Sequence, residues 1–425
     1  MTDPKELFVW TWLPTRTVPT LAGRVATVAG KHVFEYAPSY LEHEARPIFD
    51  LDLPLRPGRI DPPAAHHLAP SLRDALPDRW GRRVLARDLP GARASALEVD
   101  DIDEMDVMLR SGSDRIGALD FQISASDYVP RECPNVALED LMGFADAVDE
   151  RRGLPPALDR AIVHATSAVG GARPKALVTD HKETGARKLI AKFSSAADTI
   201  PMVKSEFMAM RLAAATGLDV APVELTRLAG RAVLLVERFD RAPTGSGWAR
   251  RGVVSALTWT QEHELAAHHI SYQTLATLII ERFVDPLRDL RELFARMTFN
   301  ILVGNTDDHA RNHAAFFDGV SLSLTPAYDI APQQRRSTTA NQALVISGGS
   351  RAAQLVVALD AAPAFQLSTT EARDIIAHQV AVIRRSWLET CEAAELTIAE
   401  RRQFQHCQFL PPYAFEGYGT APTLP

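Results

Sequence analysis

The segment 304–312, Gly-Asn-Thr-Asp-Asp-His-Ala-Arg-Asn, is the part of this chain that most restricts its possible folds. Asp307 and Asn312 stand in an Asp-x-x-x-x-Asn spacing, and a further aspartate follows at position 329 within Tyr-Asp-Ile. Phosphoryl transfer needs a carboxylate that accepts the proton of the acceptor hydroxyl, together with an aspartate and an asparagine that hold Mg²⁺. The three residue types occur in that order, so the segment predicts a phosphoryl-transfer site.

The same pattern has a plainer interpretation, because short motifs recur by chance and a polar turn after a helix often only caps that helix. The elements upstream favour catalysis. Residues 187–193 predict a strand carrying Lys192, similar to the Val-Ala-Ile-Lys strand whose lysine pairs with the nucleotide phosphates in protein kinases. A strand lysine that simply faces solvent is the alternative.

A helix is predicted next over residues 204–216, with Gly217 as its stop. Glu206 lies in its first turn, where it either aims the strand lysine, as in kinases, or only compensates the helix dipole. Two strands, 220–228 and 231–237, are expected to follow.

The segment after these strands contains Glu237 and Phe239 and is predicted to link two lobes, binding adenine through backbone groups. Before the lysine strand, the paired glycines Gly170 and Gly171 would let backbone N–H groups approach phosphate oxygens, and Lys175 adds positive charge. The glycine segment is neither a Walker A motif nor G-x-G-x-x-G, so an ordinary glycine turn is the alternative.

Taken together, segments along nearly the whole chain resemble the HipA family, the serine/threonine-kinase toxins of bacterial type II toxin–antitoxin systems. The resemblance thins beyond about residue 390. The segments that carry it are Gly-Gly-Ala-Arg-Pro-Lys at 170–175, Ala-Lys-Phe at 191–193, Val-Glu-Arg-Phe-Asp-Arg at 236–241, the segment at 304–312, Leu-Thr-Pro-Ala-Tyr-Asp-Ile at 324–330, Leu-Pro-Asp-Arg-Trp-Gly-Arg-Arg at 76–83 and Asp-Arg-Ile-Gly-Ala-Leu at 114–119.

The resemblance implies an α+β, protein-kinase-like two-lobed fold, with a mixed α/β N-terminal half, an appended N-terminal subdomain and an all-α C-terminal lobe. The expected domains are residues 1–125, the ATP-binding N-lobe at 126–245, and the mainly helical catalytic lobe at 246–425. ATP and Mg²⁺ are the implied cofactors.

In the implied mechanism, Asp307 is the base or orienter of the hydroxyl, and Asn312 and Asp329 ligate Mg²⁺. Lys192 holds the α/β-phosphates and the glycine loop covers the triphosphate. His309 is expected to brace the loop beside the nucleotide by hydrogen bonding. It also forms an H-x-x-x-H pair with His313 that could bind zinc on a helix, although no cysteine partner is close in sequence.

The resemblance also raises regulation and partners. Many members of the family autophosphorylate a serine of the glycine loop, just before its paired small residues, and this ejects the loop. Ser167 is the candidate here, but Val169 is inserted between it and the glycines, so Thr166 competes. The implied partner is a small helix-turn-helix antitoxin (HipB-like), and operator DNA is expected to be contacted only through this antitoxin. The leading candidate substrate is a glutamyl-tRNA synthetase. The alternative for residues 1–125 is that they only buttress the N-lobe.

Composition limits the function classes. A net charge of −7 argues against broad electrostatic binding of nucleic acid. Cys133, Cys391 and Cys407 are scattered, which suggests a reducing compartment, and neither a secretory signal nor a run of about 18 apolar residues is visible. We therefore expect a cytoplasmic protein without membrane contact. A small-molecule phosphotransferase, a catalytically silent binding module, and a structural protein with coincidental motifs stay open.

Two further expectations concern local structure. The segment 242–252, rich in glycine, arginine and small residues, is predicted to be a mobile loop. A helix with one apolar stripe is predicted to lead into the segment at 304; the stripe contains Leu287, Leu290, Phe294, Met297 and Ile301.

Overall fold

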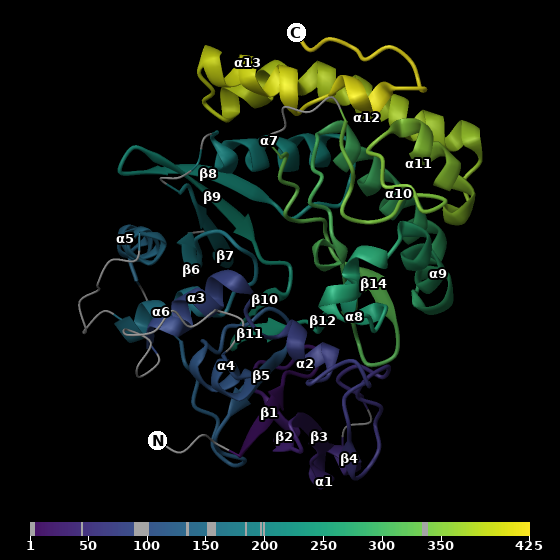
Figure 1. Ribbon diagram of the computed structural model, residues 1–425. Coiled ribbons are helices and arrows are strands. Elements are labelled where there is room, and N and C mark those ends of the chain that lie inside the picture. Colours follow the sequence, from purple (N-terminus) through teal and green to yellow (C-terminus); the bar gives the residue numbers. More distant parts are fainter. Residues whose placement is uncertain are drawn as a thin grey trace. The chain divides into compact units, whose positions relative to one another are not determined.

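The computed structural model describes residues 5–43, 46–88, 102–132, 136–150, 159–182, 185–195, 198, 200–333 and 339–425 (Figure 1). The chain forms two compact units. Unit 1 comprises Met1–Ala197, Thr226–Val254 and Phe316–Val320, and unit 2 comprises Asp198–Leu225, Ser255–Ala315 and Ser321–Pro425.

Unit 1 begins with a five-stranded antiparallel sheet of order β4-β3-β2-β1-β5. Its strands are β1 (Glu6–Thr11), β2 (Thr20–Val28), β3 (Lys31–Tyr36), β4 (Arg59–Ile60) and β5 (Leu119–Gln122). Ala29 and Gly30 join β2 to β3 with φ angles of 51° and 78°. A two-residue hairpin turn with two positive φ angles matches the twist of the strands it joins.

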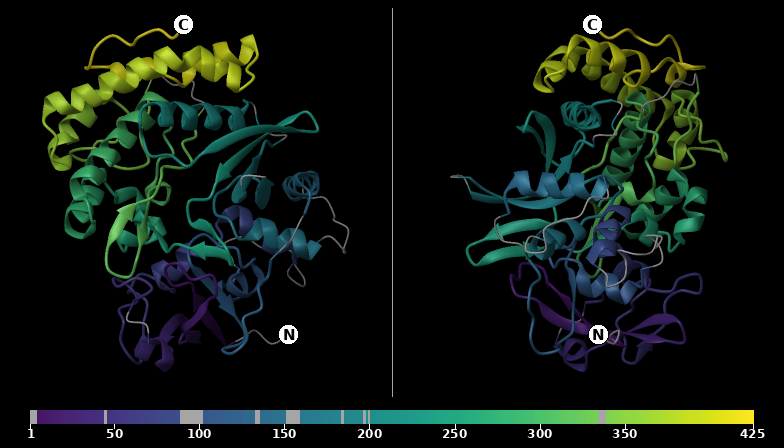
Figure 2. Two further views of the ribbon diagram at one scale, coloured as in Figure 1. Left: turned by 180° about the vertical axis from the view of Figure 1, so that it is seen from behind. Right: turned by 60° about the vertical axis from the view of Figure 1, so that its left-hand side comes forward.

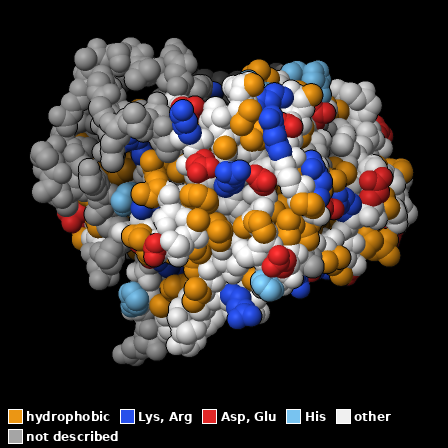
Figure 3. Space-filling model, turned by 90° about the horizontal axis from the view of Figure 1, so that it is seen from below, with side chains coloured by type: hydrophobic (Ala, Val, Ile, Leu, Met, Phe, Trp, Pro, Cys, Tyr) orange, Lys and Arg blue, Asp and Glu red, His pale blue; other side chains and the backbone are white. Residues whose placement is uncertain are grey.

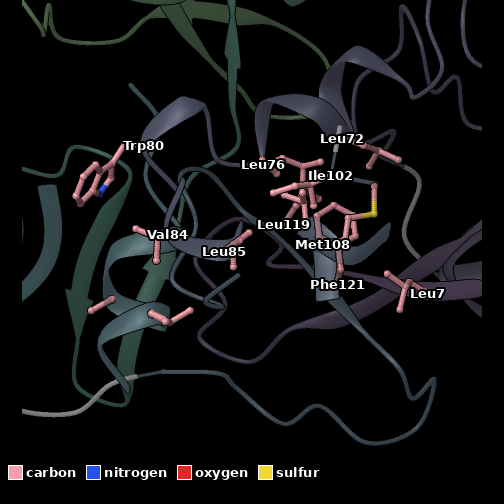
Figure 4. Close-up of a cluster of buried hydrophobic side chains, with 14 of the residues drawn as sticks. Leu7, Leu72, Leu76, Trp80, Val84, Leu85, Ile102, Met108, Leu119 and Phe121 are labelled. Atoms are coloured by element: carbon pink, nitrogen blue, oxygen red, sulfur yellow. The ribbon is translucent and has the colours of Figure 1, made fainter. Parts of the chain in front are cut away.

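Helices α1 (Pro38–His43), α2 (Pro70–Asp74), α3 (Arg79–Asp88), α4 (Glu104–Arg110), α5 (Leu138–Asp149) and α6 (Asp159–Ser167) complete the first part of unit 1. Pro70 opens α2, where its missing N–H costs nothing. The buried side chains of these elements form one apolar cluster, with Trp80 at one end and Leu72, Met108 and Phe121 at the other (Figure 4).

A second sheet of unit 1 has the order β6-β7-β9-β8. It contains β6 (Lys175–Lys182), β7 (Gly185–Phe193), β8 (Val223–Leu228) and β9 (Arg231–Glu237), so the predicted lysine strand and the two later strands are present. Ala176, Ala191, Phe193 and Val233 from this sheet belong to the same apolar cluster as Trp80. Residues from both of the first two predicted domains therefore share one core in unit 1, while Asp198–Leu225 of the second predicted domain belong to unit 2.

The segment predicted to be a mobile loop is instead a β-hairpin. Strands β10 (Arg241–Thr244) and β11 (Gly247–Arg250) pair antiparallel along their whole length. The guanidinium of Arg250 lies 3.4 Å from the ring centroid of Trp12, and its Nη1 donates to the carbonyl oxygen of Ser113 over 2.8 Å. The composition suggested mobility, but these long-range contacts of Arg250 fix the hairpin.

Unit 2 is mainly helical, as predicted, with α12 as its longest helix (Figure 2). Its α-helices are α7 (Met202–Ala215), α8 (Ala256–Trp259), α9 (Tyr272–Arg282), α10 (Pro286–Leu302), α11 (Leu355–Ala361), α12 (Thr369–Ala393) and α13 (Ile398–Cys407), and the 3-10 helices are η2 (Glu264–His269), η3 (Ala310–Asn312), η4 (Ala362–Phe365) and η5 (Pro412–Phe415). Short strands β12 (Val253–Ser255), β13 (Ala314–Phe317) and β14 (Leu322–Leu324) form a further three-stranded sheet, of which Val253, Val254, Phe316 and Phe317 belong to unit 1.

Helix α10 packs against α9 and α12 and leads to the predicted catalytic segment. Four of its five predicted stripe residues are fully buried, but Leu287 is 65% exposed. Leu287 lies in the first turn of α10, directly after Pro286, where the stripe does not yet meet a neighbouring element.

Among the described residues, no helix is long and apolar enough to cross a membrane. On the face of the molecule shown in Figure 3, basic, acidic and apolar side chains are intermixed over the coloured part.

Candidate active site

The turn that follows α10 requires glycine. Val303 is the C-cap of the helix, and Gly304 has a φ of +66°, the left-handed conformation that ends many helices. A Cβ atom on Gly304 would lie 2.9 Å from the carbonyl oxygen of Gln408. Both the φ angle and this close approach fix the point at which the chain leaves α10 for Asp307.

Asp307 is held by its backbone while its carboxylate stays exposed. Its carbonyl oxygen accepts hydrogen bonds from the His309 N–H and from Nδ2 of Asn312, each over 2.9 Å. Asn312 ends η3 and is nearly buried. The predicted base and the predicted metal ligand are therefore neighbours in a closed turn.

The adjacent Asp308 has the opposite setting, because it is buried and paired. Tyr272 on α9 donates its hydroxyl hydrogen to Asp308, and Nε2 of His313 lies 3.0 Å from Asp308 Oδ1. Burial would raise the pKa of Asp308, but His313, Tyr272 and Asn300 hold it below its ordinary value. Sequence reasoning missed this support, and it considered His313 only as a zinc ligand.

Asp329 lies next to this turn and has a φ of +57°, which is uncommon for a residue with a side chain. Its neighbour Tyr328 is anchored by a 2.7 Å hydrogen bond from its hydroxyl to the carbonyl oxygen of Arg311. Positive φ angles outside glycine concentrate at functional sites, where surrounding contacts compensate the strain.

The electrostatic setting of Asp307 differs from that of an ordinary exposed carboxylate. Desolvation raises the pKa of Asp307, the negative charges of Asp329 and Asp308 raise it further, and His309 opposes both effects. The carboxylates of Asp307 and Asp329 are thus close enough for their charges to interact. The His309 backbone N–H bonds the Asp307 carbonyl oxygen, while its Nδ1 has no hydrogen-bond partner among the described residues.

In unit 1, two lysines face each other across neighbouring strands. Lys175 on β6 is the register partner of Lys192 on β7, so their side chains lie on the same face of the sheet. The opposite face carries Ala176 and Ala191, which are fully buried. Like charges placed directly opposite each other are unfavourable on their own, and an anion bound between them would remove the repulsion.

The glycine loop lies directly before Lys175. Gly171 has a φ of +100°, and the Lys175 Nζ lies 2.2 Å from the place that a Cβ on Gly171 would occupy. The backbone conformation thus favours glycine at 171, and any larger residue would displace the Lys175 ammonium.

Thr166 and Ser167, expected in the glycine loop, end helix α6 instead, and both are fully buried. Thr166 donates to the carbonyl oxygen of Ile162 over 2.7 Å, and the Ser167 hydroxyl accepts the Gly112 N–H over 3.2 Å. Helical hydrogen bonding thus continues further than the sequence indicated.

The predicted linker after β9 is anchored by a buried network of charges. Asp114 Oδ1 lies 3.0 Å from guanidinium nitrogens of both Arg238 and Arg241, and Asp114 Oδ2 lies 3.0 Å from Lys188 Nζ. Burial would raise the pKa of Asp114, but these cations hold it well below its usual range.

A second carboxylate completes this network. Asp240 pairs with the same two arginines at 2.8 Å and accepts the Gly117 N–H over 2.7 Å. The segments 114–119 and 236–241 are therefore joined in one network of charges.

The predicted linker residues lie beside this network. Glu237 ends β9 and its carboxylate lies 3.4 Å from Arg187, while the Phe239 ring lies edge-on to Phe316 at 5.7 Å.

The predicted residues thus fall into two groups. Unit 1 brings together the glycine loop, Lys175 and Lys192 on one sheet, with the linker on the neighbouring strand β9. Unit 2 brings together Asp307, Asn312, His309 and Asp329, and it also holds Glu206, which is buried on α7. The Lys192–Glu206 ion pair stays a prediction.

The residues predicted to bind metal fit Mg²⁺ by their chemistry. Among the described residues, no group of three or more His, Cys, Asp and Glu side chains could hold a metal ion alone. Mg²⁺ commonly takes one or two protein carboxylates and completes its coordination with waters and substrate phosphates. The oxygens of Asn312 and Asp329 match that mode of binding.

Comparison with known proteins assigns the family. Residues 13–122 match the family model "HipA N-terminal domain", and residues 167–387 match "HipA-like C-terminal domain". The chain belongs to the HipA family. The predicted resemblance is confirmed over both halves of the molecule.

Individual relatives match shorter stretches. "Putative kinase Y4mE" of Sinorhizobium fredii is 34% identical over 132 residues, which cover 30% of this chain and 31% of that protein. The "Serine/threonine-protein kinase toxin HipA" of Shewanella oneidensis is 28% identical over 146 residues, covering 30% of this chain and 34% of that protein. The chain therefore spans about a third of the length of these relatives.

A solved structure extends the comparison to the fold. It is the complex of HipA, HipB and operator DNA from Shewanella oneidensis, whose matched chain superposes with a TM-score of 0.65 at 16% identity. The match covers 90% of this chain and 93% of that chain. The predicted kinase-like fold is confirmed by this match.

Proposed function

We propose that this chain is an ATP- and Mg²⁺-dependent serine/threonine-protein kinase that acts as the toxin of a type II toxin–antitoxin module. The observation that carries the proposal is the turn of unit 2 that contains the exposed Asp307. Its carboxylate lies close enough to Asp329 for the two charges to interact, and its backbone carbonyl oxygen accepts a hydrogen bond from the Asn312 side chain. A raised pKa suits a group that must take a proton during the reaction.

Each residue has one part in the proposed reaction. Asp307 orients the acceptor hydroxyl and takes its proton, while the oxygens of Asn312 and Asp329 hold Mg²⁺. When bound, Mg²⁺ supplies neutralisation of the charge that develops on the transferred group. Lys192 and Lys175 hold the phosphates, and the facing arrangement of the two lysines supports this assignment.

The toxin role and the partners rest on the family. A relative that matches part of this chain is named a toxin, and the HipA of the superposed structure was solved with HipB and operator DNA. We infer a HipB-like helix-turn-helix antitoxin as the partner here, with DNA contacted through it. A tRNA synthetase, such as glutamyl-tRNA synthetase, is the proposed substrate.

Self-inactivation at Ser167 or Thr166 stays part of the proposal, with a structural condition. Both side chains are fully buried at the end of α6, so their phosphorylation requires the last turn of that helix to open. Phosphopeptide mapping after incubation with ATP tests this step, and absence of phosphate from both residues would reject it.

Nucleotide binding is tested first by thermal unfolding with and without ATP and Mg²⁺. A ligand at a hundred times its dissociation constant adds about 2.7 kcal/mol of stability. Transfer from labelled ATP to protein acceptors is then compared with transfer to small-molecule acceptors. Label on proteins that disappears with Asp329→Asn supports the kinase proposal, label on small molecules alone favours a phosphotransferase, and no nucleotide effect removes both.

A further inference from the structure

The segment 78–83, named here the loop scaffold, bonds to the glycine loop at successive positions, although sequence reasoning gave it no task at the nucleotide site. Asp78 Oδ2 accepts the Gly171 N–H over 3.1 Å, and the Trp80 N–H donates to the Gly171 carbonyl oxygen over 2.9 Å. Arg83 donates to the carbonyl oxygen of Ala172. Trp80 Nε1 donates to the carbonyl oxygen of Lys175 over 3.0 Å.

Asp78 stands at the start of α3, where its carbonyl oxygen accepts the Arg82 N–H over 2.9 Å. A side chain at this position ordinarily accepts the N–H of the second or third helical residue. Here the N–H of the second residue, Trp80, goes to Gly171, and the Asp78 carboxylate bonds the N–H of that same glycine. The beginning of α3 and the glycine loop therefore exchange hydrogen bonds.

The glycine loop and the loop scaffold approach each other closely. A Cβ on Gly170 would lie 2.7 Å from Asp78 Oδ2. On the other side, a Cβ on Gly81 would lie 2.7 Å from the carbonyl oxygen of Ser167, at the end of α6. Trp80 is fully buried, so the scaffold is part of the core of unit 1 (Figure 4).

We propose that Asp78 is a positioning residue for the nucleotide, because it fixes the glycine loop in its binding conformation before ATP arrives. Glycines lose more conformational freedom on ordering than other residues, and a loop ordered in advance spares the ligand that cost. The scaffold takes both polar backbone groups of Gly171 and leaves the tip residues Ala172 and Arg173 exposed. The inference rests on the proposed function, since it concerns how Asp78 sets the affinity of that same site for ATP.

The test compares Asp78→Ala and Asp78→Asn with a matched control, Asp106→Ala. Asp106 is an acidic side chain of unit 1 with similar exposure, 20% against 27%, and it pairs with Arg110 at 3.0 Å on α4. The KM for ATP and kcat are measured with Mg²⁺, and hydrogen exchange of residues 170–175 is measured without nucleotide. Thermal unfolding shows whether each variant is folded.

We expect Asp78→Ala to raise the KM for ATP about tenfold, the size of one lost hydrogen bond to a charged group, with kcat unchanged. Exchange at residues 170–172 rises in the same variant. Asp78→Asn restores most of the affinity because its amide oxygen still accepts the Gly171 N–H, and Asp106→Ala matches the wild type.

Three results would overturn the inference. Wild-type KM and exchange in Asp78→Ala would show that the contact positions nothing. A lower KM would show that the carboxylate competes with phosphate. If the wild-type protein binds ATP but the Asp78 variants show no effect, the inference is wrong and the proposed function still stands. If the wild-type protein does not bind ATP, both the proposed function and the inference are wrong.

Discussion

Aspartates gather at two places in this molecule, and their charges are balanced in opposite ways. In unit 1, Asp114 and Asp240 share Arg238 and Arg241, and Lys188 adds a further positive charge. In unit 2, Asp307 has two other aspartates as electrostatic neighbours, and His309 opposes them.

The balance is visible in the pKa values. The carboxylates of the unit 1 network have lowered pKa values despite burial, while desolvation and like charge raise the pKa of Asp307. A carboxylate surrounded by matched cations stays ionised and holds structure together. A carboxylate that has other carboxylates as neighbours is costly to keep ionised. It is a candidate catalytic group, because perturbed pKa values cluster at functional sites. Asp308, next to Asp307, belongs with the structural class.

The largest effect expected from this contrast is on activity. Asp307→Ala should lower kcat by at least about a thousandfold, because it removes the group that orients and deprotonates the acceptor. Stability should stay close to the wild type, since the Asn312 side chain bonds the backbone carbonyl of residue 307 and not its carboxylate. Labelled phosphate transfer and thermal unfolding check the two halves of this prediction. A variant that unfolds early or keeps its activity would place Asp307 in the structural class.

The pH profile of the wild type gives a milder form of the same test. Activity should fall as the pH drops through the raised pKa of Asp307, so the acidic limb lies above that of an ordinary carboxylate. His309 lowers that pKa, and His309→Ala should therefore move the acidic limb to higher pH. An unmoved limb in this variant would mean that another group controls the profile.

The next effect is on stability. Asp114→Asn should destabilise the protein by about 3–5 kcal/mol, because Arg238, Arg241 and Lys188 then lose a charged partner inside unit 1. The lowered pKa of Asp114 also determines how its contribution to stability changes with pH. Its contribution is present above the ordinary carboxylate value and is lost as the pH falls through the lowered one. Denaturant unfolding at neutral pH measures the loss, and a change below about 1 kcal/mol would show that the network is dispensable.

Much of this arrangement could be predicted from the sequence, and the rest fails for identifiable reasons. The lysine strand and the helix that stops before Gly217 follow from local patterns, which the structure confirms. Local patterns carry no information about partners far away in the chain. In the buried network, one hydrogen bond joins Gly117 and Asp240, which are 123 positions apart in the sequence.

The candidate site divides in the same way. The spacing of Asp307, Asn312 and Asp329 could be found by motif, since the residue types and their order are local information. The support of Asp308 by Tyr272 comes from a helix 36 residues earlier, and the hold of Asp78 on Gly171 spans 93 residues. Ser167 and Thr166 were placed in a loop because the helical hydrogen bonds that bury them leave no signature next to a glycine pair.

Another prediction uses Asp52, a buried aspartate of unit 1. Burial raises the pKa of Asp52 to about 7, even though its carboxylate accepts the Ser71 N–H over 2.7 Å. A raised pKa means that the folded state holds a proton that the unfolded state releases. The contribution of Asp52 is thus complete below the ordinary value of 3.8 and is lost as the pH rises through about 7.

Asp52→Asn should therefore stabilise the protein more at pH 8 than at pH 5, because the loss that begins at 3.8 is only partly developed at pH 5. The amide stays neutral at both pH values, and its oxygen can still accept the Ser71 N–H. The gain should be about 2 kcal/mol, since relaxation around a buried charge reduces its full cost. Unfolding curves at the two pH values measure the difference. Equal curves for the variant and the wild type at pH 8 would mean that Asp52 is ionised there at no cost.

The smallest effect on stability is expected for an arginine and its carboxylate partners at the solvent-exposed surface. Arg24 lies 3.0 Å from Glu6 and 2.8 Å from Glu35, so it joins two carboxylates as the arginines of the buried network do. Its side chain is 51% exposed, and solvent screens the attraction that the interior leaves strong. Arg24→Ala should cost less than about 1 kcal/mol, and added salt should shrink even that difference. Denaturant unfolding of this variant beside Asp114→Asn isolates burial as the variable. A loss for Arg24→Ala as large as that for Asp114→Asn would show that pairing alone, and not the burial of the pair, determines what these charges contribute.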